Sequence, residues 1–89
     1  MIENIKKQVK NRLNRIGGQV QGLQKMVEEE KYCVDIITQS SAIRQALSAV
    51  ENLMLENHLS THVMHQVKKG QSKKAIEEIL KIYKLAKKK

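Results

Sequence analysis

One cysteine and three histidines are the residues of this chain best suited to chemistry: Cys33, His58, His62 and His65. At 100° per residue, an α-helix carrying them would place His58 and His62 within about 20° of Cys33 and His65 within about 40° of it, so all four lie on one face. A thiolate with two imidazoles suits Cu(I), and suits Zn(II) or Ni(II) if a further donor such as His65 completes the coordination. The same pattern also fits a buried, chemically inert cysteine and histidines that only cap helix carbonyls.

The spacing of these residues decides how they could share one ion. Cys33 and His58 are 25 residues apart, which is about 37 Å along a helix that rises 1.5 Å per residue. They can meet only if a second copy of the helix runs antiparallel to the first, with a two-fold axis near Ala46 and Leu47. The spacing therefore predicts a site between subunits, with Cys33 from one chain and His58 and His62 from the other.

The elements that would position these residues are predicted to be helices. The chain of 89 residues has no proline and four glycines, and its common residues favour helix. Apolar residues at helical spacing predict one all-α domain over residues 1–89, with helices at about 4–27, 31–68 and 73–87. The first helix carries one heptad series and a second one interleaved with it: Ile2, Val9, Ile16 and Leu23, then Leu13, Val20 and Val27. The second helix also carries two series: Ile36, Ile43 and Val50, then Cys33, Ser40, Leu47 and Met54.

Composition indicates where in the cell the protein is expected and which classes of function it lacks the residues for. No apolar run is long enough for a membrane span, and the N-terminus lacks the order of a secretion signal, so we expect a cytoplasmic protein with no membrane partner. A single cysteine cannot form an internal disulfide, which fits a reducing compartment. The chain lacks a Ser/His/Asp order, a phosphate loop and paired carboxylates. Cys33 with a histidine across a dimer would still lack an oxyanion hole and a substrate pocket, so we expect no enzyme and no small-molecule substrate.

The net charge of +8 is concentrated at the two ends of the chain. Residues 1–27 carry a net charge of +5, residues 28–67 carry −4, and residues 68–89 carry +7. Such segregation favours a cationic surface that binds a polyanion. Because Trp and Phe are absent, stacking of single-stranded bases is disfavoured and duplex DNA is the better candidate. The basic residues proposed to contact it are Arg12, Arg15, Lys10, Lys6 and Arg44.

Four motifs together resemble one known family. They are NRLNRIGGQVQG at residues 11–22, MVEE at 26–29, YCVD at 32–35 and NHL at 57–59. On these residues the chain is similar to the CsoR/RcnR family of bacterial metal-sensing and stress-sensing repressors, and the match covers nearly its whole length. The resemblance implies a three-helix subunit without a helix-turn-helix. It also implies that the second helices pair in an antiparallel four-helix-bundle dimer, and that dimers assemble into a homotetramer.

The resemblance also assigns roles to individual residues. Cys33 matches the family's thiolate ligand, and His58 and His62 match the two ligands from the partner subunit, while His65 remains a possible accessory ligand. The commoner copper pattern has a second cysteine where this chain has His62. Tyr32 and Glu78 match outer-shell residues that link the copper site to DNA release.

Metal identity and the DNA surface follow from the same comparison. The Cys-His-His set occurs in some copper members and in nickel/cobalt members, but the latter add a histidine near the N-terminus, where residues 1–4 offer none. Cu(I) is therefore the first choice, with Ni(II), Co(II) or Zn(II) as the alternative. Arg12 matches the first-helix arginine of the family, whereas Ala49 stands where some copper members have a second arginine.

The resulting hypothesis is a repressor that binds double-stranded operator DNA when metal-free. It is released when Cu(I) binds, which derepresses genes for copper export or handling. A nickel-, cobalt- or zinc-responsive repressor of the same architecture is the runner-up. A helical DNA-binding protein without any effector is the second alternative.

Overall fold

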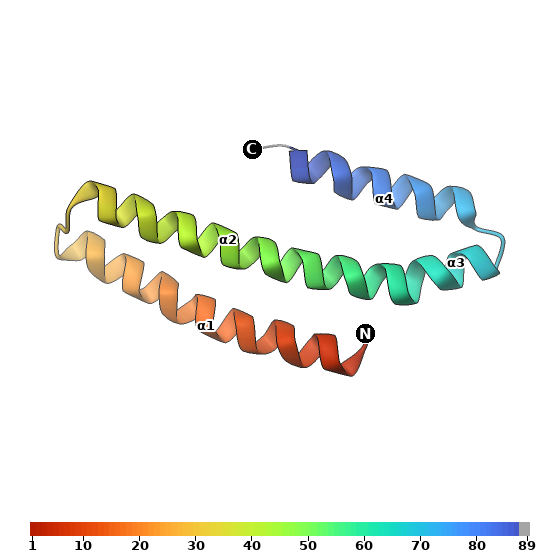
Figure 1. The fold of residues 1–89 in the computed structure, drawn as a ribbon, viewed down its shortest axis with the longest axis horizontal. Coiled ribbons are helices and arrows are strands. Elements are labelled where there is room, and N and C mark those ends of the chain that lie inside the picture. The colour runs from red at the N-terminus through yellow and green to blue at the C-terminus, as the bar shows by residue number, and fades with distance from the viewer. Residues whose placement is uncertain (88–89) are drawn as a thin grey trace. The chain divides into compact units, whose positions relative to one another are not determined.

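The computed structural model describes residues 1–87, and it is helical throughout them apart from turns. Its elements are α1 (Glu3–Glu28), α2 (Cys33–His58), the π-helical turn η1 (Leu59–Val63), α3 (Met64–Lys68) and α4 (Ser72–Lys87) (Figure 1). The predicted all-α fold is confirmed, since the described residues contain no strand. The chain divides into two compact units, one from Met1 to Leu55 and the other from Glu56 onward. That all 89 residues act as a single domain stays a prediction.

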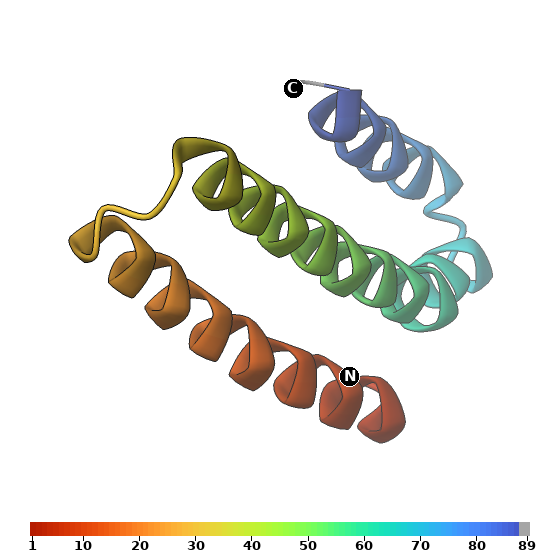
Figure 2. The same ribbon diagram turned by 60° about the vertical axis from the view of Figure 1, so that its left-hand side comes forward.

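The first unit is a helical hairpin in which α1 and the greater part of α2 lie side by side and antiparallel (Figures 1 and 2). Its core joins residues at helical spacing on the two helices: Ile5, Val9 and Ile16 from α1 with Ile43 and Val50 from α2. Each of these side chains is at most 9% exposed. The heptad series predicted on α2 through Ile43 and Val50 therefore faces α1, and burying each such side chain contributes about 1.5–3 kcal/mol.

Several residues of the second apolar series on each helix are not covered within the chain, although Met54 of α2 packs against the core. On α1, Leu13, Val20 and Val27 are 44%, 41% and 56% exposed, and on α2 Leu47 is 40% exposed. The interleaved residues of α1 are thus not part of the hairpin core. The physical reason is that a helix with two apolar stripes needs two partners, whereas the hairpin supplies each helix with one.

The turn between α1 and α2 explains why α2 begins at Cys33 and not near Lys31. Glu30 adopts a positive φ of 53°, and the amide of Lys31 donates to the carbonyl oxygen of Met26 at 3.0 Å. This is the hydrogen bond that closes a helix C-terminus around a left-handed residue, a position that glycine usually occupies. The chain therefore leaves α1 through a tight turn before α2 starts.

The second unit contains the end of α2, the π-turn η1, and helices α3 and α4. Helical conformation runs without interruption from residue 33 to residue 68, so the helix expected over 31–68 is a succession of α2, η1 and α3. Gly70, with φ of 76°, ends α3, and α4 then packs against α3 and η1.

No helix among the described residues is both long and apolar enough to cross a membrane.

Candidate metal centre

Two of the predicted ligands, His58 and His62, come together at the junction of α2 and η1. Their rings stack with centroids 5.2 Å apart and an interplanar angle of 27°. His58 is the last residue of α2 and His62 lies within the π-turn. Four residues correspond to about one turn in either geometry, so the two imidazoles lie on the same side. Single π-turns inside helices occur frequently at functional sites.

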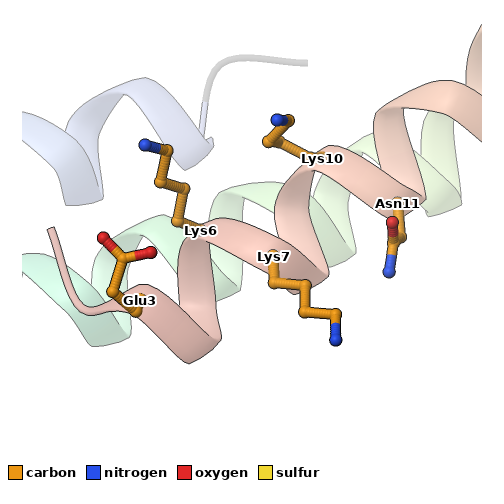
Figure 3. A pocket seen from close by; sticks show the side chains of 5 residues that line it. All are labelled: Glu3, Lys6, Lys7, Lys10 and Asn11. Carbon is orange, nitrogen blue, oxygen red and sulfur yellow. The ribbon is translucent and has the colours of Figure 1, made fainter.

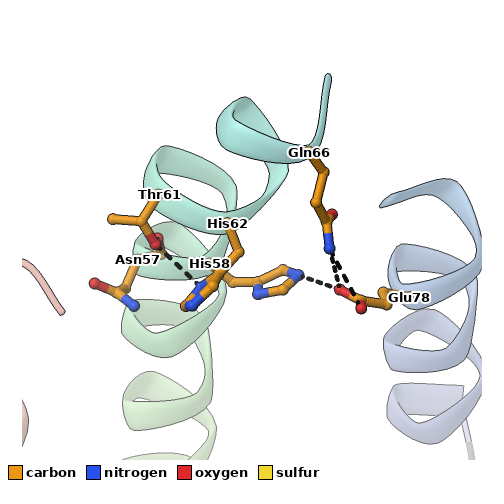
Figure 4. Close-up of polar contacts among 6 residues, drawn as sticks. All are labelled: Asn57, His58, Thr61, His62, Gln66 and Glu78. Carbon is orange, nitrogen blue, oxygen red and sulfur yellow. Dashed lines mark hydrogen bonds and ion pairs between the residues drawn. The ribbon is translucent and has the colours of Figure 1, made fainter. Parts of the chain in front are cut away.

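A carboxylate from α4 faces this histidine pair. Glu78 Oε2 lies 3.1 Å from His58 Nε2, and Gln66 donates from Nε2 to both carboxylate oxygens of Glu78 at 3.4 Å (Figure 4). Gln66 is only 9% exposed, whereas the side chains of His58 and Glu78 are 24% and 36% exposed. The predicted outer-shell residue Glu78 is thus placed against a predicted ligand, and Gln66 links both to α3.

The Glu78 contact determines which nitrogen of His58 is available. His58 Nε2 is buried and lies close to Glu78 Oε2, but the two groups are not aligned well enough to form a hydrogen bond. An ionised carboxylate only accepts hydrogen bonds, so a proton on Nε2 is favoured there and a lone pair on Nε2 would be repelled. In neutral His58 this environment favours a lone pair on Nδ1, so Nδ1 is the nitrogen that could bind a metal.

A hydroxyl group contacts the second histidine. Thr61 Oγ1 donates to the backbone carbonyl of Asn57 at 2.7 Å and lies 3.1 Å from His62 Nδ1 (Figure 4). Thr61 is half-buried, whereas His62 is exposed. The exposed ring can therefore reach a group outside its own helix.

Cys33 and Tyr32 belong to the first unit, at the N-terminal end of α2, and both are exposed. His58 ends the same 26-residue helix, so Cys33 and His58 stand at its opposite ends. Among the described residues of one chain, no three His, Cys, Asp or Glu side chains are grouped so that they could hold a metal ion. The second unit brings His58, His62 and Glu78 together, and Cys33 belongs to the first unit.

His65, the possible accessory ligand, lies on α3 and is exposed. Its backbone carbonyl accepts a hydrogen bond from the amide of Lys69 at 3.1 Å. No side-chain contact places the imidazole beside His58 or His62 in the part of the chain that the structure describes.

The residues predicted to contact DNA are all exposed and all lie in the first unit. Arg12 and Arg15 border a shallow depression that also includes Ile16, Gln19 and Ala46. A second depression near the start of α1 is lined by Glu3, Lys6, Lys7, Lys10 and Asn11. There Lys6 and Lys10, one turn apart, extend to the same side of the helix (Figure 3). Arg44 is exposed on α2.

Two residues of the site were absent from our sequence-based predictions. Gln66 could have been found because His58, His62 and Gln66 follow one another at intervals of four and so share a helix face. Thr61 gave no such signal, since a threonine beside a histidine is unremarkable in a sequence. Its role depends on where its single hydroxyl proton points.

The sequence also matches a known family of proteins over most of its length. Residues 5–84 fit the family described as metal-sensitive transcriptional repressor. The chain belongs to this family. The resemblance seen in the sequence motifs is thereby confirmed, and the family is one of transcriptional repressors.

Individual relatives carry more specific names. The copper-sensing transcriptional repressor CsoR of Bacillus subtilis is 46% identical over 79 residues, which are 89% of this chain and 78% of the relative. The copper-sensing transcriptional repressor RicR of Mycobacterium tuberculosis is 48% identical over 59 residues, covering 66% of this chain and 62% of the relative. The match thus spans less than two thirds of RicR. A crystal structure of the copper-sensing repressor CsoR with Cu(I) from Geobacillus thermodenitrificans superimposes with a TM-score of 0.87 at 39% identity, over 99% of this chain and 91% of that one.

The donor set suits the metal named for these relatives. Cys33 is an exposed free thiol, and His58 keeps an imidazole nitrogen directed away from Glu78. One thiolate and two imidazoles match the low coordination number and soft ligands that Cu(I) prefers. No carboxylate need be a ligand, because Glu78 is already engaged with Gln66 and His58.

Proposed function

We propose that this chain is a Cu(I)-responsive repressor that binds operator DNA when metal-free and is released when Cu(I) binds. The observation that carries the proposal is the contact of His58 with Glu78. The imidazole that offers Nδ1 for ligation has its Nε2 3.1 Å from a carboxylate of α4. A change at the ligand nitrogen can therefore alter how α4 is held. The names of the relatives in Bacillus and Geobacillus support copper as the metal.

We propose that the ligands come from two chains, Cys33 from one and His58 and His62 from the other. The support is that Cys33 and His58 stand at opposite ends of α2, about 37 Å apart along a helix of that length. An antiparallel copy of α2 would reverse these ends and bring them together. Leu47, exposed in the single chain, lies near the middle of α2, where such copies would cross.

The working assembly in this proposal is a homodimer that pairs again into a homotetramer, located in the cytoplasm. A cytoplasmic location keeps Cys33 reduced and gives access to DNA. Its DNA-binding surface includes Arg12, with Arg15, Lys10, Lys6 and Arg44 as further contacts. These cations would neutralise phosphates, so DNA affinity should fall steeply with salt.

When the metal is bound it supplies a positive charge and fixed bonds to the three ligands. The chain's own residues then perform the switch. His58 would hold the metal through Nδ1, and engaging that nitrogen would change the contact of Nε2 with Glu78. Tyr32, next to Cys33, comes from the partner subunit in this arrangement and completes the same network. Glu78, which is part of α4, would pass the change to its own helix and, through the hydrogen bonds that it accepts from Gln66, to α3.

The test is a DNA-binding titration under anaerobic conditions. Duplexes are first selected from a random pool with the metal-free chain, and the best one is labelled for fluorescence anisotropy. Cu(I) should weaken binding by about 5–150-fold, the usual range of allosteric coupling, and Ni(II), Co(II) and Zn(II) should have smaller effects. If Ni(II), Co(II) or Zn(II) had a larger effect than Cu(I), that metal and not copper would be the effector. Binding that no metal changes would indicate a DNA-binding protein without an effector and refute the proposal.

A further inference from the structure

The hydroxyl group of Thr61 touches both the backbone and a proposed ligand. Its Oγ1 is 2.7 Å from the carbonyl oxygen of Asn57 and 3.1 Å from Nδ1 of His62. Figure 4 shows the hydroxyl close to the His62 ring, within the π-turn that carries both residues. Neither the family match nor the names of the relatives assign a role to this threonine.

The number of protons on Thr61 decides the direction of the second contact. A hydroxyl has one proton, and the Asn57 carbonyl can only accept, so that proton is used in the 2.7 Å hydrogen bond. Oγ1 must therefore accept toward His62, and Nδ1 of His62 must carry a proton and donate. In the neutral imidazole the lone pair is then on Nε2.

We propose that Thr61 is a positioning residue that fixes His62 in the tautomer protonated on Nδ1, so that Nε2 is the nitrogen offered to the metal. The part of this inference that concerns metal binding rests on the function proposed above. The two stacked imidazoles would then bind the metal through different nitrogens. His58 would use Nδ1, because its Nε2 faces Glu78. His62 would use Nε2, because its Nδ1 faces Thr61. A hydrogen bond to the nitrogen that does not ligate is a common way of orienting metal-bound histidine.

The chain also contains a matched threonine that lacks the imidazole. Thr38 Oγ1 donates to the carbonyl oxygen of Val34 at 2.8 Å, the same bond to the fourth preceding residue that Thr61 makes to Asn57. Thr38 and Thr61 thus share the backbone hydrogen bond and differ in the contact with histidine. Thr38→Val controls for loss of the backbone bond alone.

The experiment uses the full chain as wild type, Thr61→Val, Thr61→Ser and Thr38→Val. The first readout is the ¹⁵N NMR spectrum of the metal-free imidazoles at about pH 8.5, where histidine is ordinarily neutral. His62 is assigned by comparison with His62→Gln. The wild type, Thr61→Ser and Thr38→Val should show His62 protonated on Nδ1, and Thr61→Val should shift the proton toward Nε2. The second readout is Cu(I) affinity, measured anaerobically against the chelator bicinchoninate.

Thr61→Val should bind Cu(I) about 10–100-fold more weakly, the usual cost of losing a hydrogen bond behind a metal-bound histidine. Thr61→Ser and Thr38→Val should stay within about threefold of wild type. A wild-type His62 protonated on Nε2, or a Thr61→Val chain with unchanged tautomer and unchanged affinity, would overturn the role of Thr61. A wild-type chain that binds no Cu(I) would refute the proposed function, and the tautomer of metal-free His62 would still decide the role of Thr61.

Discussion

Replacing Glu78 with alanine should uncouple copper binding from DNA release. Glu78 on α4 contacts a proposed ligand, through its Oε2 and His58 Nε2 at 3.1 Å. It also accepts from Gln66 Nε2 at both carboxylate oxygens. Glu78→Ala removes these contacts together and leaves His58 and His62 in place. Metal can still bind, but α4 no longer responds to it.

The size of the effect follows from the contacts that are lost. A hydrogen bond to a charged group contributes about 1.5–3 kcal/mol, but the His58 contact is poorly aligned and both side chains are partly exposed, so about 1 kcal/mol is reasonable. The two 3.4 Å contacts from Gln66 are at the long end of hydrogen bonding and add about 0.5 kcal/mol. If these contacts exist in only one of the two states, metal-free or metal-bound, Glu78→Ala lowers the coupling free energy between Cu(I) and DNA by about 1–2 kcal/mol. Typical coupling free energies are about 1–3 kcal/mol, so most of the coupling would be lost.

The assay measures the Kd for the selected duplex with and without Cu(I), at one salt concentration, for wild type and variants. Glu77→Ala is the matched control, because it makes the same charge change at a neighbouring exposed position of α4. The ratio of the two Kd values should fall about 5–30-fold in Glu78→Ala and stay near wild type in Glu77→Ala. Linkage requires the same fall in the ratio of Cu(I) affinities of free and DNA-bound protein. If Glu78→Ala retains the wild-type ratio, α4 is not coupled to the metal through Glu78.

Four further substitutions test other parts of the structure. Cys33→Ala should abolish the effect of Cu(I) on DNA affinity, and a response that survives it would remove the thiolate from the site. Leu47→Asp, which places a charge at an exposed apolar position of α2, should shift the assembly toward monomer in sedimentation velocity. Glu30→Gly should raise the free energy of unfolding by about 0.5–1 kcal/mol in urea denaturation, because glycine relieves the positive φ of 53°. Arg12→Ala should reduce the slope of log K against log salt by about 0.9 if Arg12 contacts one phosphate.

The helical fold could be predicted because its signals are local and repeated. The heptad series through Ile43 and Val50 specified the buried face of α2, and those residues are in the core. The same periodicity also includes Leu13, Val20 and Val27, which the hairpin leaves exposed. Periodicity shows that a helix has an apolar stripe but not whether the partner belongs to the same chain.

The candidate site was predictable in residue type but not in its contacts. The spacing of His58 and His62 placed both on one side, and the family resemblance singled out Glu78. The π-turn at residues 59–63 could not be foreseen, because it reflects a small difference in free energy between two helical geometries. The buried amide of Gln66 and the hydroxyl of Thr61 likewise act through individual protons, which residue types alone do not specify.

The division of the proposed site between chains links metal binding to assembly. One chain already orients two imidazoles, through Glu78 for His58 and through Thr61 for His62, so two of the three proposed ligands need little reorganisation. Cys33, at the far end of α2, completes the set only when a second chain is present. A ligand that binds the dimer and not the monomer stabilises the dimer by RT ln(1 + [L]/Kd), about 2.7 kcal/mol at one hundred times Kd. By the same linkage, dilution that dissociates the dimer must weaken Cu(I) binding, whereas a site made within one chain would be indifferent to protein concentration.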